Sequence, residues 1–342
     1  MRIGSTRWGR RCAAVLSMAA VTTLLVAACG SDSSGGGSTT LRIGYIPDVH
    51  GAGLVDSASQ QKFWAKAGVR AQLSSFANGP NEIQAIQAGK LDIAYIGPGA
   101  LYSAMAGKVD VIAIDSTSSA DALVVDAAKV PDLKSLAGKT IGYAQGTSSQ
   151  MILDLALDKA GLTNDQVTLR PLDQNLIPTS FLSGKIDVAS AFPGGTQQIL
   201  AKDKGARILV SDNDFAPKYI FPEVWVASPD LVKKDPAKVV AFLKAFILAN
   251  DWRRTHLPEV ISASAATAES STEAQAYLSE KTNWLSAAEI LQDGQSGTTD
   301  QWFTALNQLF IRTGQGTALT PPSRYNNIAL FKQAYDAVHP EK

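Results

Sequence analysis

Short β-branched runs and longer amphipathic runs alternate along the chain from residue 41 onward. Residues 41–45 are apolar enough for a buried strand, and 54–67 have the apolar spacing of a helix. Residues 69–76 alternate as a second strand. A helix is predicted at 80–88, because Pro80 suits a first helical turn, where its missing N–H would be unpaired anyway. Further short strands are predicted at 93–96, 109–114 and 122–126. This order indicates an α/β fold.

Two segments 95 residues apart have nearly the same sequence. Gly89-Lys90-Leu91-Asp92-Ile93-Ala94 returns as Gly184-Lys185-Ile186-Asp187-Val188-Ala189, and a proline–glycine pair follows each copy. Upstream, Ile43-Gly44-Tyr45 returns as Ile141-Gly142-Tyr143. Each copy has the pattern of a buried strand that leads through a loop into a helix, so the repeat predicts two similar α/β lobes. Ligands of open α/β sheets bind outside the carboxyl ends of the strands, and two facing lobes would therefore form a cleft.

The last third of the chain has the pattern of a helical region that follows a returning strand at 224–227. Asp235-Pro236 supplies a cap and a first-turn proline for a helix that ends near Arg254. Its apolar stripe, which we expect to pack in the core, consists of Val239, Val240, Phe242, Leu243, Phe246 and Ile247. Further helices are predicted at 271–285, 300–312 and 326–338.

We expect the second lobe to be inserted into the first. A turn-rich boundary at 130–138 separates the first strand–helix series from a second one at 140–210. The predicted division is 41–126 plus 223–342 for the first lobe and 127–222 for the second. The chain would then cross between the lobes near Asp126 and near Pro222.

Residues 1–28 have the pattern of an export signal. Arg2, Arg7, Arg10 and Arg11 precede an apolar run at 13–26 that is too short to span a membrane. The segment ends Val26-Ala27-Ala28-Cys29-Gly30, which resembles a bacterial lipobox, so we expect a lipid on Cys29. Residues 29–40 are that cysteine and a flexible Ser/Gly-rich tether. We therefore expect an exported protein, lipid-anchored on the extracytoplasmic face of the cell membrane. The route stays open between general and twin-arginine export.

Charge and cysteine content narrow the class of protein. Removal of the signal leaves 27 basic and 31 acidic residues, a net charge of −4, which gives no basic surface for nucleic acid. Cys12 leaves with the signal, so the mature body has no cysteine besides the anchor, which excludes disulfides and thiolate catalysis. His50, His256 and His339 show no metal-ligand spacing, and we expect neither a metal nor a cofactor.

Four segments form an ordered set in the body of the chain, at 44–50, 76–80, 88–98 and 132–140. In this order and spacing, behind a lipobox, they resemble the sulfonate/nitrate/taurine group of ABC-transporter substrate-binding proteins. These are lipoproteins related to the thiamine-pyrimidine-synthesis fold. The resemblance covers essentially the whole mature chain. It implies a type II periplasmic-binding-protein fold, α/β in class, with two βα lobes, a cleft between them and a helical C-terminal part.

The resemblance also implies a function. It is that of an extracytoplasmic, lipid-anchored solute-binding component of an ABC importer, a monomer that presents a small molecule to a membrane permease. An aliphatic sulfonate or taurine is the solute expected first. Nitrate, a thiamine-type pyrimidine or another small organic acid would fit the same architecture. Enzymes on this fold need cleft nucleophiles or acid–base pairs, and the chain shows no convincing pair of this kind, so we do not expect an enzyme.

In the family, the strand-end loops of both lobes line the cleft, which gives the candidate residues in this chain. Residues 78–80 and 146–148 start helices, where free N–H groups and the helix dipole attract an anion, although plain capping explains the same residues. Glu223 and Trp225 would reach a ligand amine or stack on a ring, with hinge packing as the alternative for Trp225. The candidate set is His50, Phe76, Asn78, Gly79, Gly97, Pro98, Gly99, Gly146, Thr147, Ser148, Phe192, Pro193, Glu223 and Trp225.

None of the candidate loops contains a lysine or an arginine. A sulfonate would therefore depend on backbone donors, hydroxyls and helix dipoles, whereas Asp48 and Glu223 would suit the amine of taurine. Asp92 and Asp187, the carboxylates of the repeat, lie before their strands at the end opposite the cleft. We predict a structural turn role for both of them.

Overall fold

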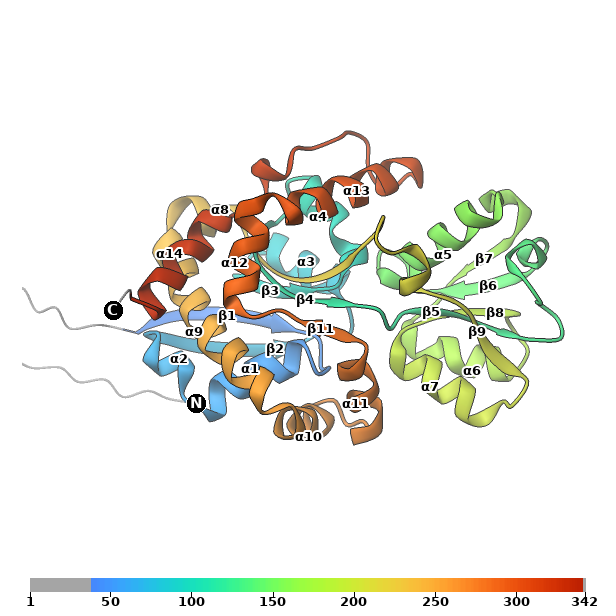
Figure 1. Cartoon of the computed structure of the whole chain (residues 1–342), viewed down its shortest axis with the longest axis horizontal. Helices are drawn as coiled ribbons and strands as arrows, with labels where there is room; N and C mark the ends of the chain where they lie inside the picture. The colour runs from blue at the N-terminus through green and yellow to red at the C-terminus, as the bar shows by residue number, and fades with distance from the viewer. Residues whose placement is uncertain (1–37, 341–342) are drawn as a thin grey trace, which may run out of the picture. The chain divides into compact units, whose positions relative to one another are not determined.

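Two β-sheets organise residues 38–340, the part of the chain that the computed structural model describes (Figure 1). The first sheet has the strand order β11-β4-β10-β3-β1-β2 and the second has the order β7-β6-β8-β5-β9. We call each sheet with its helices lobe 1 and lobe 2. The strands are β1 (Thr39–Tyr45), β2 (Val69–Ser75), β3 (Ile93–Ile96), β4 (Asp110–Ser118), β5 (Ala122–Asp126), β6 (Thr140–Tyr143), β7 (Thr168–Pro171), β8 (Val188–Ala191), β9 (Ala206–Ser211), β10 (Phe221–Ala227) and β11 (Thr282–Trp284).

Helices connect these strands and make up most of the last third of the chain. The α-helices are α1 (Gly51–Gln60), α2 (Phe63–Lys66), α3 (Gly79–Gln87), α4 (Tyr102–Met105), α5 (Ser148–Ala160), α6 (Ile177–Leu182), α7 (Pro193–Lys202), α8 (Pro229–Lys234), α9 (Pro236–Thr255), α10 (Leu257–Thr267), α11 (Thr272–Glu280), α12 (Ala287–Ser296), α13 (Thr298–Arg312) and α14 (Ile328–Val338). Helix α9 packs against α1, α2, α14 and β4. All six residues of its predicted apolar stripe are buried, which confirms that prediction.

The internal repeat appears as two matching pieces of parallel sheet. In lobe 1, β1 pairs with β3 at Ile43 and Gly44, and in lobe 2, β6 pairs with β8 at the equivalent Ile141 and Gly142. Side chains pack tightly over both glycines, because a Cβ on either would lie 2.6 Å from the δ-carbon of Leu91 or Ile186. In each copy, the glycine thus leaves room for a side chain, Leu91 or Ile186, that comes just before the neighbouring strand.

Each repeat carboxylate, directly before β3 or β8, bonds to the parallel neighbouring strand. Asp92 Oδ2 accepts a hydrogen bond from the backbone N–H of Arg42 (2.8 Å), and Asp187 Oδ2 accepts one from the backbone N–H of Thr140 (2.9 Å). Asp92 additionally forms an ion pair with the Arg42 guanidinium. Both carboxylates thus have the structural role that the sequence predicts.

Two chain segments cross between the sheets. Residues 119–121, the first crossing, join β4 to β5, and residues 212–220, the return crossing, join β9 to β10. Residues 122–126 are predicted in the first lobe, but this strand pairs with β8 and β9 and so lies in the second sheet. Ala122–Val125 are buried on both faces, and such a pattern does not reveal which sheet a strand joins.

Two predicted helices differ from the structure. The helix expected at 54–67 is interrupted after α1, because Lys62 takes a left-handed conformation (φ 59°) before α2. The helix expected at 271–285 ends at Glu280, and the chain continues as β11, which pairs with the end of β4. Asn283, on β11, belongs to an edge strand too short for its alternation to stand out from a helical pattern.

Contacts from α13 join the two lobes away from the crossings. The Arg312 guanidinium lies 3.1 Å from Asp158 Oδ2 on α5 and 2.9 Å from the hydroxyl of Tyr219 in the return crossing. Gln315, just after α13, donates to Asp154 Oδ2 (2.9 Å). These side chains hold the C-terminal helices of lobe 1 against lobe 2.

The expected export signal, Cys29 and most of the tether lie outside the described residues. Within 38–340, no helix has the length and apolar character needed to cross a membrane.

Candidate functional site

The loop between β1 and α1 places Asp48 and His50 at the end of the first sheet. Asp48 Oδ1 accepts hydrogen bonds from the backbone N–H groups of His50 (3.0 Å) and Gly51 (2.8 Å). Burial nevertheless raises the pKa of Asp48 to about 7. The His50 ring is buried, lies 2.8 Å from Thr282 Oγ1 on β11, and has its pKa lowered to about 4 by burial. His50 is therefore neutral near pH 7 and supplies no positive charge.

The predicted loops at 97–99 and 146–148 meet across the lobes. The short 3-10 helix η1 (Pro98–Ala100) of lobe 1 contacts α5 of lobe 2. A Cβ on Gly99 would overlap the carbonyl group of Thr147, so only glycine permits this approach. Gly146 has φ 73°, and the position of a Cβ on it lies 3.2 Å from the Tyr102 hydroxyl. The structure thus brings Gly97, Pro98 and Gly99 together with Gly146, Thr147 and Ser148.

The side chains of Asn78 and Thr147 cap the helices that they precede. Asn78 Oδ1 accepts from the backbone N–H of Asn81 (3.1 Å), and Thr147 Oγ1 accepts from that of Ser149 (3.2 Å). The Thr147 hydroxyl also donates to Ala144 O (2.7 Å). Each cap satisfies one of the several unpaired N–H groups of a helix start. Capping therefore accounts for the two side chains and leaves other backbone donors at α3 and α5.

Glu223 lies on β10, next to the turn at Gly97. Glu223 is 8% exposed, and its Oε2 accepts a hydrogen bond from the Tyr95 hydroxyl (2.8 Å). A Cβ on Gly97 would lie 3.3 Å from the same oxygen. Burial raises the pKa of Glu223 well above its usual value, and the charges of Asp48 and Asp121 raise it further. The structure thus places this candidate beside the η1 loop.

Two candidate aromatic residues pack within lobe 1. The Trp225 side chain is fully buried, donates from Nε1 to Asp115 Oδ1 (3.1 Å) and lies against the rings of Tyr95 and Phe242. Phe76 is partly buried and packs against the lobe 1 core. Trp225 therefore packs within the first sheet, which agrees with the packing alternative rather than with stacking on a ligand ring.

The remaining candidates begin helices. Gly79 starts α3, where the position of its Cβ is within 3.3 Å of Ile96 and Ala100 side-chain atoms. Phe192 precedes α7 and Pro193 is its first residue. Helix α7 also contacts α11, so the lobes meet on this side as well.

Sequence reasoning missed a buried ion pair beneath the loop that holds His50. Arg253 Nη2 lies 2.7 Å from Asp115 Oδ1, and both side chains are fully buried. Arg253 also donates to His50 O (3.2 Å) and to Asn250 Oδ1 (2.8 Å). A signal was available, because Arg253 continues the apolar stripe of α9 from Phe246 and Ile247 at helical spacing.

Sequence reasoning also missed two carboxylates in the crossings. Asp121 and Asp212 are 4% and 2% exposed, and the backbone N–H of Asp121 donates to Asp212 Oδ2 (3.1 Å). Burial raises the pKa of Asp121 to about 7, against the effect of a hydrogen bond from Ser148. Burial and the charge of Asp121 raise the pKa of Asp212 well above its usual value. Together with Asp48 and Glu223 they form a set that we call the interlobe carboxylates.

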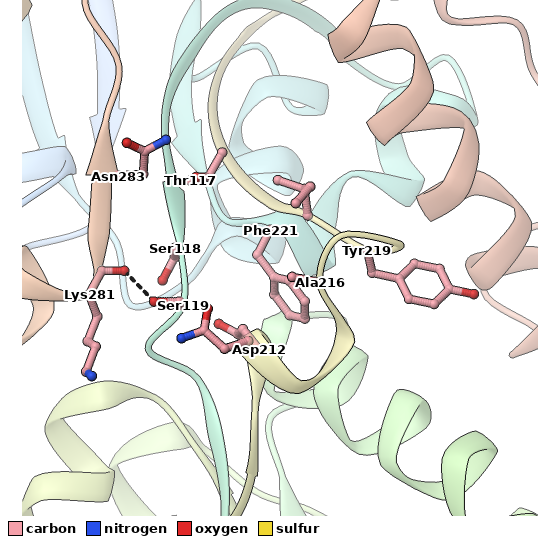
Figure 2. Close-up of a pocket in the computed structure, with 11 residues that line it drawn as sticks. Thr117, Ser118, Ser119, Asp212, Ala216, Tyr219, Phe221, Lys281 and Asn283 are labelled. Atoms are coloured by element: carbon pink, nitrogen blue, oxygen red, sulfur yellow. Dashed lines mark hydrogen bonds between the residues drawn. The ribbon is translucent and has the colours of Figure 1, made fainter.

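A cavity of about 160 Å³ lies beside Asp212 (Figure 2). Both crossings and the β11 segment form its wall, and Figure 2 shows their side chains around it. Its lining residues are Thr117, Ser118, Ser119, Asp212, Asn213, Ala216, Tyr219, Ile220, Phe221, Lys281 and Asn283. Ser119 Oγ donates to Lys281 O (2.9 Å), which links the first crossing to β11. The cavity wall thus mixes polar and apolar side chains and contains one buried carboxylate.

No group of three or more His, Cys, Asp or Glu residues within 38–340 has the arrangement of a metal site. The site therefore consists of carboxylates, hydroxyls and helix starts as far as the described residues show.

Comparison with known proteins places these features in a family. The model of the family described as NMT1/THI5 like matches residues 53–256. A Brucella abortus protein, provisionally named a binding protein, is 30% identical over 292 residues, which cover 83% of this chain and 89% of the relative. A Bacillus subtilis protein, provisionally named an aliphatic sulfonates-binding protein, is 28% identical over 198 residues, or 57% of this chain and 59% of the relative.

Solved structures share the fold. The alkanesulfonate-binding protein SsuA from Xanthomonas axonopodis pv. citri, bound to MOPS, superposes with a TM-score of 0.64 at 18% identity, covering 84% of this chain and 97% of SsuA. The desulfurization enzyme DSZB superposes with a TM-score of 0.59 at 17% identity, covering 87% and 99%. These likenesses confirm the predicted type II periplasmic-binding-protein fold, which carries both binding proteins and an enzyme.

Proposed function

Because the chain belongs to the NMT1/THI5-like family, we propose that it is the extracytoplasmic solute-binding component of an ABC importer. One observation carries the proposal: strand-end loops of both lobes meet, with η1 against the start of α5. Two lobes that close in this way can enclose a small solute and later release it to a permease. A lipid on Cys29 would hold the protein, as a monomer, at the membrane that contains the permease.

The solute class that we propose is that of small organic sulfonates, with taurine as one member. The Bacillus relative and the SsuA structure support this class through what they are named for. The starts of α3 and α5, where the helix dipole attracts an anion, would receive the sulfonate oxygens. Within the class, Asp48 and Glu223 favour taurine, which carries an ammonium group, over amine-free alkanesulfonates.

A binding role fits this chain better than catalysis. The DSZB likeness is a likeness of fold, at 17% identity. Residues 38–340 contain no cysteine that could act as a nucleophile. The buried carboxylates are divided among a loop, both crossings and β10, and a hydrogen bond from the Asp121 backbone N–H to Asp212 links the two crossings.

A ligand screen tests the proposal. The protein is stripped of retained solute, and its thermal unfolding is followed with sulfonates, taurine, nitrate and pyrimidines. A solute at about 100 times its Kd adds about 2.7 kcal/mol to the free energy of unfolding, which is several degrees in Tm. Small-angle scattering of the same samples should show compaction with the stabilising solute. Absence of any stabilising solute, together with unchanged dimensions, would contradict a solute-binding role.

A further inference from the structure

The interlobe carboxylates gather like charges in a place from which water is largely excluded. They come from the loop after β1 (Asp48), the first crossing (Asp121), the return crossing (Asp212) and β10 (Glu223). The charges of Asp48 and Asp121 act on Glu223, and those of Asp121 and Glu223 act on Asp212. Three of the four are less than 10% exposed, and the Asp48 side chain is 23% exposed. Buried carboxylates in such proximity require a counter-charge or protons.

The described residues contain no buried cation that is free to balance this set. Arg253 is a buried cation whose charge acts on Asp48, but its guanidinium is already paired with Asp115. Lys281 lines the cavity beside Asp212, but it is exposed and its ammonium lies over the Tyr277 ring (5.8 Å). Among the residues described, the set therefore has no dedicated counter-charge when it ionises.

One carboxylate of the set borders a cavity. Asp212 Oδ2 accepts a hydrogen bond from the Asp121 backbone N–H, and the fully buried Asp212 Oδ1 lacks a hydrogen bond of good geometry. The same side chain lines the cavity of about 160 Å³ shown in Figure 2. A buried carboxylate that is short of donors is costly, and the cavity that the Asp212 side chain borders offers room for a group that supplies N–H donors.

We propose that the solute carried by this protein bears a positively charged nitrogen, a protonated amine or an amidinium, and that the interlobe carboxylates bind it. This inference rests on the proposed function and names the chemistry of its solute. An ammonium or amidinium group would supply both the missing charge and the missing donors. An alkanesulfonate without an amine would face the same carboxylates with a negative charge, which raises its free energy in the site.

The binding of a cation here is coupled to proton release. Burial raises the pKa values of Asp48 and Asp121 to about 7, so both groups are largely protonated at pH 5.5. A cation stabilises their ionised forms, so its affinity rises with pH until the groups are ionised without it. Other groups also act on Asp48 and Asp121. Between pH 5.5 and pH 8, His50 is neutral and Arg253 stays charged. The groups that face the two carboxylates are His50, Glu82, Tyr95, Asp115, Ser148, Asp212, Glu223 and Arg253.

The test compares ethanesulfonate with taurine, which differs from it by one ammonium group, and with agmatine, a cation that has no sulfonate. The full-length protein is extracted in detergent, and native mass spectrometry identifies any solute that it retains. Calorimetry on the stripped protein then measures the affinity of each probe at pH 5.5 and pH 8. We expect a nitrogen-bearing probe to bind at least about tenfold tighter than ethanesulfonate, and about tenfold tighter at pH 8 than at pH 5.5.

Substitutions assign the effect to the set. Glu223→Gln, which keeps an acceptor for Tyr95, should lower the affinity for the cationic probe at least about tenfold. Asp48→Asn replaces it in the experiment if the first variant unfolds. Glu259→Gln, exposed on α10, is the matched control and should change affinity less than about twofold. Ethanesulfonate binding as well as taurine, or a retained solute without a basic nitrogen, overturns the inference and leaves the proposed function standing. Retention of no solute and binding of no probe would reject both.

Discussion

The two copies of the internal repeat share their backbone and differ in the chemistry of their loops. In lobe 2, the Ser149 hydroxyl accepts from Ala144 N (2.9 Å) and donates to Ser190 O (2.7 Å), so this side is satisfied by its own hydroxyls. In lobe 1, the equivalent end of the sheet carries two carboxylates, Asp48 in the loop after β1 and the fully buried Glu82 on α3, and burial raises the pKa of Glu82 well above its usual value. The common framework fixes where these groups lie, and lobe 1 has carboxylates at the end of the sheet where lobe 2 has hydroxyls.

Arg253→Met tests whether lobe 1 depends on its buried ion pair. The variant leaves Asp115 buried without a counter-charge, which should cost about 3–5 kcal/mol in the free energy of unfolding. Chemical denaturation measures it. Arg254→Met, on the partly exposed neighbour, should cost less than about 1 kcal/mol. Equal losses of unfolding free energy for the two variants would show that the buried ion pair stabilises the fold no more than the exposed one does.

Gly99→Val tests the contact between the lobes. The new side chain would overlap the Thr147 carbonyl group, so the lobes could not close and solute affinity should fall at least about 100-fold, or about 2.7 kcal/mol. Scattering should show that this variant no longer compacts with solute. Gly316→Ala, whose Cβ would make ordinary contacts with Ile311 at 3.4 Å, is the control and should bind normally. Normal affinity in the valine variant would mean that the solute binds without this contact.

The stability of the solute-free protein should depend on pH because of Asp48 and Asp121, two of the interlobe carboxylates. The pKa values of Asp48 and Asp121 are about 7 when folded and about 3.9 when unfolded, so the folded state binds more protons between these values. Stability from these groups is therefore lost as pH rises from about 4 to about 7. We expect Tm to be several degrees higher at pH 5 than at pH 8, measured by circular dichroism.

Asp121→Asn should flatten this pH profile, because the amide does not ionise. Asp173→Asn, at an exposed position in lobe 2, should leave the profile as it is. Profiles that coincide for wild type and Asp121→Asn would show that Asp121 is not a source of the pH dependence.

The two repeat carboxylates should contribute slightly different amounts to the free energy of unfolding. Asp92→Ala loses a backbone hydrogen bond and the Arg42 ion pair, at a cost of about 2 kcal/mol, whereas Asp187→Ala loses a backbone hydrogen bond, at about 1 kcal/mol. The pKa of Asp92 is lowered, because the hydrogen bond and charge of Arg42 outweigh burial. Its contribution is present above the unfolded pKa and is lost as pH falls below it, so urea unfolding at pH 3 should show a smaller difference than at pH 7. A larger cost for Asp187→Ala would reverse the comparison.

The sequence predicted the framework well because the framework rests on local patterns. The repeats at Asp92 and Asp187 and the stripe of α9 are periodic in sequence, and the structure has the elements that they indicate. The sheet that β5 joins was not predictable, because Ala122–Val125 are buried on both faces.

The candidate site was predicted in part, for a similar reason. Gly99 and Thr147 were named from loop positions, and the structure brings them into contact. Asp121 and Asp212 were missed because their burial arises where two distant segments cross, and nothing in the neighbouring sequence records that meeting. Arg253 was missed because an arginine near a helix end ordinarily indicates a solvated charge.

The unequal lengths of the two crossings limit which solutes fit. The first crossing, 119–121, has about six backbone dihedral angles to distribute a rotation, and the return crossing, 212–220, has about three times as many. The shorter segment therefore fixes the pivot and sets the distance at which the loops of the two lobes meet. A solute longer than that distance holds the loops apart and a shorter one leaves them without contacts, so we expect the protein to discriminate among homologous solutes by length as sharply as by charge.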